Sequence, residues 1–154
     1  MDMALCYNPL IESFDLSLGS EGLATDDTLA SAVLVALLCD RLAADYEVPR
    51  GADRRGWWAD SLTDNPFKTG SRLWLLEREK QLPGAVLRCK QYCEEALQYF
   101  IDDGLARAIT VTVFTPRPGW LVAMIKMELS TGSRNYRFEY DEANQRWRLA
   151  GEDV

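Results

Sequence analysis

The chain has 154 residues, and its 17 lysines and arginines against 24 aspartates and glutamates give a net charge of −7. This acidity argues against a duplex nucleic-acid binder, and the complete absence of histidine excludes serine–histidine or cysteine–histidine catalysis within the chain. We expect one domain over residues 1–154, because this length can bury one good core and the composition is that of a folded globular protein.

No pattern for a metal or a cofactor is found. The commonest metal ligand, histidine, is missing, and the four cysteines form no paired knuckles, so they are most simply buried thiols. Glycine-rich phosphate-binding loops are also absent. The longest apolar stretch, residues 29–39, is about half of the ~20 residues that a membrane span needs. We therefore expect no cofactor, no membrane contact and a reducing cytosol as the site of synthesis.

The first predicted elements are a short strand and a helix. Residues 14–18 alternate apolar and polar side chains, as a half-buried strand does. A helix follows, with Thr25 as its N-cap, acidic residues in its first turn, and helical spacing of apolar side chains that continues to Leu42. Because nearly every position from 29 to 39 is apolar, this helix is expected to be buried on most sides.

Residues 48–70 form the least regular part, and within it residues 53–60 contain the run Arg-Arg-Gly-Trp-Trp. Tryptophan and arginine are the residues that most often anchor interfaces, which favours a partner-binding surface. The alternative is a loop whose tryptophans cap the core while its arginines pair with Asp53 and Asp60. The two interpretations are compatible, since one tryptophan can face inward while the arginines face a partner.

Two further helices are predicted, over residues 71–80 and 85–102. The second has an apolar stripe that includes Cys89, Cys93 and Phe100, and Gly104 is placed to end it. From residue 107 the period changes to two, which predicts strands at 107–115, 120–129, 136–140 and 146–149. The expected fold is α+β: a short N-terminal strand, two to three helices, then a three- to four-stranded antiparallel sheet packed on the helices. The strands at 14–18 and 146–149 are the expected edges.

Carboxylates are numerous, so a two-carboxylate glycan hydrolase is the alternative function. Its candidate acids are Glu77, Glu79, Asp60 and Asp64. However, the run from Glu77 to Lys80 alternates in sign, which is equally typical of an ion-paired helix face.

The segments 53–60 and 70–80, together with the runs Glu-Glu-Ala-Leu at 94–97 and Ile-Asp-Asp-Gly at 101–104, resemble a Mu-type phage tail protein family. That family is similar to the small wedge proteins of contractile-tail baseplates and to the corresponding small baseplate component of type VI secretion systems. The resemblance covers most of the chain and is strongest from residue 53 to residue 104. The Glu-Pro-Arg motif of some distant wedge relatives is absent here.

The resemblance implies a structural subunit of a contractile phage or prophage tail and not an enzyme. Such a protein binds larger wedge, hub and sheath proteins in the virion baseplate, is made in the host cytoplasm, and can associate with itself when isolated. Some relatives carry a lysozyme-like label, but no acid–base pair can be singled out here. Combining the motif chemistry with this resemblance, we predict the following partner-binding residues: Arg54, Arg55, Trp57, Trp58, Arg72, Trp74, Glu77, Arg78, Glu79 and Lys80.

Overall fold

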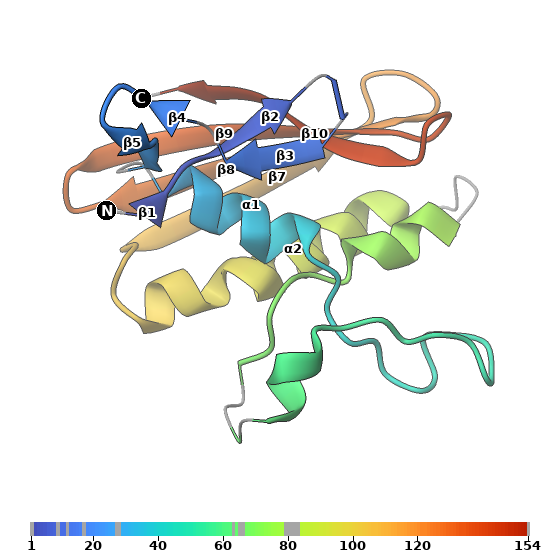
Figure 1. Ribbon diagram of the computed structural model, residues 1–154. Helices are drawn as coiled ribbons and strands as arrows, with labels where there is room; N and C mark the ends of the chain where they lie inside the picture. Colours follow the sequence, from blue (N-terminus) through green and yellow to red (C-terminus); the bar gives the residue numbers. More distant parts are fainter. Residues whose placement is uncertain are drawn as a thin grey trace.

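A four-stranded antiparallel sheet with two α-helices across one face forms the body of the protein, as the computed structural model shows (Figure 1). The structure describes residues 2–8, 10–11, 13–16, 18–26, 29–62, 64, 67–78 and 84–153. The expected α+β class is confirmed. The helices precede the sheet in the chain, so a helical layer and an antiparallel layer pack on one core.

The sheet has the strand order β10-β9-β8-β7, in which every neighbouring pair is antiparallel. Its strands are β7 (Ala108–Phe114), β8 (Trp120–Leu129), β9 (Gly132–Asp141) and β10 (Arg146–Asp153). All four predicted strands are present, although β9 begins earlier and β10 is longer than predicted. Ile125 lies opposite Tyr136 and Ala123 opposite Phe138, and these four side chains are at most 1% exposed. They form the floor of the core.

Helix α2 (Ala85–Asp102) packs against β7 and covers this floor. Its bounds are those predicted, because its apolar stripe repeats at helical spacing and needs no distant contact to be recognised. Cys89, Cys93 and Phe100 on that stripe are fully buried. Gly104, at φ +73°, lets the chain leave the helix in the left-handed region and turn into β7, as predicted.

Helix α1 (Ala30–Leu38) is shorter than predicted at both ends. Thr25 is not its N-cap; it belongs to β6 (Thr25–Asp26), where it pairs with Met3. The helix ends at Leu38 because Cys39 is extended and its carbonyl accepts a hydrogen bond from Ser71, so the chain cannot continue helically to Leu42. Most of the helix is buried, as expected, and the face that includes Val33 and Leu37 lies in the core.

The N-terminal residues form three small antiparallel pairs instead of one strand. These are β1 (Asp2–Met3) with β6, β2 (Leu5–Asn8) with β3 (Ser13–Leu16), and β4 (Leu18–Gly19) with β5 (Gly22–Leu23). The predicted strand at 14–18 therefore corresponds to β3 and the start of β4, with residue 17 outside the described residues. None of these pairs joins the four-stranded sheet, so of the two expected edge strands only β10 is an edge of that sheet.

Residues 39–72 form a long excursion, called the lobe below, that extends away from the sheet beyond the helices (Figure 1). It contains the 3₁₀ turn η1 (Trp58–Ser61) and is followed by the 3₁₀ helix η2 (Leu73–Arg78). The predicted α-helix at 71–80 is thus a 3₁₀ helix over its described part, and residues 79 and 80 lie outside the described residues.

Candidate functional site

The two ends of the lobe are joined into a narrow neck. Asp40 and Ser71 form a parallel bridge, in which Ser71 N donates to Cys39 O at 2.9 Å and Arg41 N donates to Ser71 O at 2.8 Å. The Ser71 hydroxyl donates to Leu37 O at 2.5 Å and ties the neck to α1. At Gly70, with φ +88°, an added Cβ would lie 2.3 Å from Cys39 O, so only glycine fits this close approach.

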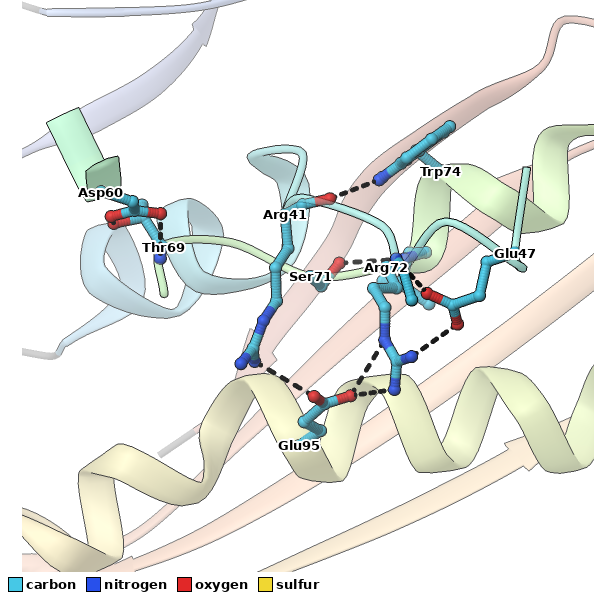
Figure 2. Close-up of polar contacts among 10 residues, drawn as sticks. Arg41, Glu47, Asp60, Thr69, Ser71, Arg72, Trp74 and Glu95 are labelled. Atoms are coloured by element: carbon cyan, nitrogen blue, oxygen red, sulfur yellow. Dashed lines mark hydrogen bonds and ion pairs between the residues drawn. The ribbon is translucent and has the colours of Figure 1, made fainter. Parts of the chain in front are cut away.

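Arg72 links the lobe to α2 (Figure 2). Its Nη1 pairs with Glu47 at 2.5 Å within the lobe, and its Nη2 pairs with Glu95 of α2, also at 2.5 Å. Its guanidinium lies 4.9 Å from the ring of Tyr92, and Glu95 is shared with Arg41 at 3.3 Å. Burial alone would lower the pKa of Arg72, but the hydrogen bond and charge of Glu95 and the charge of Glu47 raise it overall. Arg41 and Arg72 therefore both connect the lobe to α2 through Glu95.

In the Arg-Arg-Gly-Trp-Trp run, the second arginine turns toward the neck and η2, whereas the first makes its contacts within the lobe. Arg55 Nη1 lies 2.8 Å from Asp40 and 3.6 Å from Glu77, and its guanidinium stacks 4.6 Å from the ring centre of Trp74. Arg54 donates through Nε to Ala43 O and pairs with Asp45, each at 2.7 Å.

The alternative interpretation, in which these arginines pair with Asp53 and Asp60, is not what the described residues show; both acids accept other hydrogen bonds. Asp53 accepts from the backbone N–H of Arg55 at 2.9 Å. Asp60 accepts from the backbone N–H and the hydroxyl of Thr69, at 2.8 and 3.0 Å (Figure 2). These bonds connect η1 to the segment that leads back from the lobe to the neck.

The two tryptophans of the run face outward. Trp57 is 53% exposed and Trp58 is 72% exposed, with their ring centres 6.1 Å apart. Leu62, just after η1, is 73% exposed. The predicted alternative, in which these rings cap the core, is therefore wrong. Trp57, Trp58 and Leu62, which we call the aromatic tip, are exposed apolar side chains at the start and the end of η1, of the kind that marks interaction sites.

The other predicted residues lie beneath or beside this tip. Trp74 is 2% exposed and donates through Nε1 to Arg41 O at 2.9 Å, so it belongs to the core and not to the surface (Figure 2). Glu77 lies beside Trp74, because both contact the guanidinium of Arg55. Arg78 ends η2 and its side chain, like Glu79 and Lys80, lies outside the described residues. Sequence reasoning missed Glu47, Glu95 and Leu62, because nothing local in the sequence marks their distant partners or their exposure.

A cavity of about 590 Å³ lies between α1, η2 and the β9–β10 turn, and its lining includes Asp40, Glu77 and Asp141. Two of these acids, Asp40 and Glu77, lie against the guanidinium of Arg55, at 2.8 and 3.6 Å. Within the described parts of the chain, no group of three His, Cys, Asp or Glu residues could hold a metal ion, and no helix is long and apolar enough to cross a membrane.

Comparisons with known proteins place these features in a family. Residues 29–136, which contain the whole lobe and α2, match the family described as phage protein GP46. The chain is 42% identical to the baseplate protein gp46 of Escherichia phage Mu over 121 residues, which cover 77% of this chain and 82% of that protein. It is 39% identical to the Mu-like prophage FluMu protein gp46 of Haemophilus influenzae over 123 residues, which cover 80% and 84% of the two chains. The chain therefore belongs to the GP46 phage protein family.

Proposed function

We propose that this chain is a structural subunit of a contractile phage or prophage tail baseplate, and that it docks onto other baseplate proteins through the aromatic tip. One relative is named a baseplate protein, and the family match spans the whole lobe. The observation that carries the proposal is the exposure of Trp57 and Trp58, next to Arg55 of the same run, which is turned toward Asp40.

The physical argument rests on the cost of exposed tryptophan. Each indole carries a large apolar surface, and a partner that removes it from water gains about 25 cal/mol for each Å² of apolar area. The lobe is already held by the ion pairs of Arg55 and Arg72, so little loop ordering opposes docking. A pair of exposed tryptophans on a lobe that is held in this way therefore has the composition of an interface hot spot.

The partners we expect are the larger wedge and hub proteins, with the sheath reached through a second contact. Strand β10 is an edge of the sheet, and an edge strand can take up an additional strand from another protein. We place the contact to the sheath at this edge. In the absence of partners, the same exposed apolar surface would favour association between copies of the isolated chain.

The experiment is co-expression with each larger baseplate protein encoded beside this chain, followed by affinity capture and titration. Trp57→Ala combined with Trp58→Ala should weaken binding by roughly 30-fold or more, which corresponds to about 2 kcal/mol for a single hot-spot residue. The matched control is Leu18→Ala, which also truncates an exposed apolar side chain (82% exposed) but lies outside the lobe. Unchanged binding by the folded double variant would refute the tip as the docking surface.

The glycan hydrolase lacks a comparable observation in its favour. Glu77 is paired with Arg55, Asp60 is occupied by Thr69, and Glu79 lies outside the described residues. Release of soluble fragments from purified cell wall by the wild-type protein, lost in Glu77→Gln, is the result that would favour an enzyme over a structural protein.

A further inference from the structure

The sheet face that turns away from α1 and α2 carries two arginines, one on β9 and one on β10. Because side chains alternate along a strand, the core positions 123, 125 and 127 place 120, 122 and 124 on the outer face. One cross-strand row there runs from Arg148 through Glu139 and Val122 to Phe114. Arg137 lies one step along the same face, opposite Met124. The outer face is thus a defined surface with a fixed register.

Glu139 is held between two arginines at the centre of this surface. Arg148 donates to Glu139 Oε2 through Nε at 3.2 Å and Nη2 at 2.6 Å, and Arg137 Nη2 lies 2.9 Å from Oε1. The hydrogen bond from Arg148 is the main cause that lowers the pKa of Glu139. The Glu139 side chain is only 13% exposed, whereas those of Arg137 and Arg148 are 45% and 59% exposed. Two guanidiniums therefore share one carboxylate, and both present donors to solvent.

Trp120 supports a third arginine beside them. The guanidinium of Arg117 lies 4.2 Å from the ring centre of Trp120, and that of Arg148 lies 5.3 Å from it. In the described part of the chain, Arg117 has no carboxylate within ion-pair distance. Phe114, 41% exposed, continues the surface on β7. We call the set Arg117, Trp120, Arg137, Glu139 and Arg148 the arginine face.

The charge of the chain is distributed unevenly around this face. Residues 105–154 contain seven lysines and arginines against six aspartates and glutamates, whereas residues 1–104 contain ten against eighteen. The strongly acidic chain therefore carries its positive side chains disproportionately on the sheet. The net negative charge of the whole chain favours basic partners, but the local charge at the arginine face is positive and favours an acidic one.

We propose that the arginine face docks an acidic segment of a partner protein, whose carboxylates take the outward donors of Arg117, Arg137 and Arg148. Arginine matches a carboxylate through paired N–H donors, and the rings of Trp120 and Phe114 offer apolar area beside those donors. A nucleic acid fits less well, because its affinity normally comes from many lysines and arginines that neutralise a continuous run of phosphates, whereas this face offers three guanidiniums on a chain of net charge −7. This inference concerns a different surface from the aromatic tip and stands independently of it.

The test is fluorescence anisotropy with the full-length chain and a labelled peptide of about twelve residues that alternates glutamate and leucine. We expect saturable binding that weakens as salt rises, and no binding of the peptide in which glutamine replaces glutamate. Arg117→Gln should weaken binding by about fivefold without affecting folding, because Arg117 leaves no buried carboxylate behind. The triple variant Arg137→Gln, Glu139→Gln, Arg148→Gln should weaken it by at least about tenfold.

Three controls make the result decisive. Lys90→Gln, on α2, removes a half-exposed cation away from the sheet and should leave peptide binding unchanged. The Trp57→Ala, Trp58→Ala variant should also bind normally, which separates this inference from the proposed docking tip. Failure of the peptide to bind, or equal binding by the triple variant, overturns the proposal. So do preferential binding of single-stranded DNA through the same arginines, and self-association in sedimentation that the triple variant abolishes.

Discussion

Arg72 offers the sharpest test of how the lobe is held. Arg72→Ala removes the cation that joins Glu47 of the lobe to Glu95 of α2. Glu47 is only 12% exposed and would keep one described hydrogen bond, from Ala44 N at 2.8 Å. Glu95 is better placed, because it is 37% exposed and retains Arg41 at 3.3 Å. The main cost is therefore a nearly buried carboxylate that loses its counterion.

Breaking a fully buried ion pair costs about 3–5 kcal/mol, and the partial exposure of this network reduces that figure to about 2–3 kcal/mol. Loss of the stacking on Tyr92 adds about 0.5–1 kcal/mol. We expect a total of about 3 kcal/mol, or a fall in Tm of about 6–12 °C for a domain of this size. Urea unfolding, followed by tryptophan fluorescence and far-ultraviolet circular dichroism, measures the difference.

Lys90→Ala is the matched control, since Lys90 and Glu94 form an exposed pair at 3.7 Å on α2 itself. Its loss should change the free energy of unfolding by no more than about 0.5 kcal/mol. Arg72→Lys should fall between the two, because an ammonium cannot span both carboxylates as a guanidinium does. If Arg72→Ala and Lys90→Ala cost the same, the network does not stabilise the lobe and the argument is refuted.

Three further outcomes follow from the neck, the sheet and the thiols. Gly70→Ala should lower the free energy of unfolding in urea by about 3 kcal/mol or more. Gly51 is also at positive φ but has open space around it, so Gly51→Ala should lower it by only about 1–2 kcal/mol. Equal losses of stability would contradict a tight neck. The pKa of Glu139 is lowered from 4.5, chiefly by Arg148, so its contribution to stability is present above that value and is lost as the pH falls through the folded pKa. Glu139→Gln should therefore show a smaller drop in urea midpoint between about pH 7 and about pH 3 than the wild type, and an equal drop would place the acid sensitivity elsewhere. Ellman's reagent should label Cys6 quickly and Cys39 more slowly, because burial and Asp40 raise the pKa of Cys39. Cys89 and Cys93 should react only when the protein unfolds. Four fast thiols would contradict the burial of Cys89 and Cys93.

The elements that could be predicted are those whose signal is local. Helix α2 and strand β8 have the predicted bounds, because their side-chain periods are complete within the segment itself. Strand β10 extends beyond the predicted 146–149, since its second half passes a register shift between Leu149 and Gly151 that interrupts the alternation. The bounds of a helix or strand could therefore be predicted where its side-chain period is unbroken, as in α2 and β8, and not where a bulge interrupts it, as in β10.

The elements that could not be predicted depend on contacts between distant residues. Helix α1 was expected to continue to Leu42, but Ser71 takes the Cys39 carbonyl and ends it earlier. The alternating charges from Glu77 to Lys80 predict ion pairs along one helix, yet Glu77 pairs with Arg55 from the lobe. Nothing in the sequence near either residue reveals its partner. The composition of the motif therefore does not reveal the direction of its side chains.

That direction is the strongest argument for a docking role. Arg55 adopts a left-handed conformation, at φ 53°, and Gly56 at φ 98° packs so closely that an added Cβ would lie 2.8 Å from Leu42 Cβ. These two residues reverse the chain, so that Arg55 points to Asp40 at the neck while the side chains of Trp57 and Trp58 remain exposed. A loop selected only for stability would bury its tryptophans and leave its arginines in water. Here a left-handed backbone and the ion pairs of Arg55 leave both tryptophans more exposed than Arg55 itself, and strain of this kind is typically retained where it serves function. Because the same contacts also fix the tip before a partner arrives, binding loses little conformational entropy, which is the property that a permanent joint in an assembly requires.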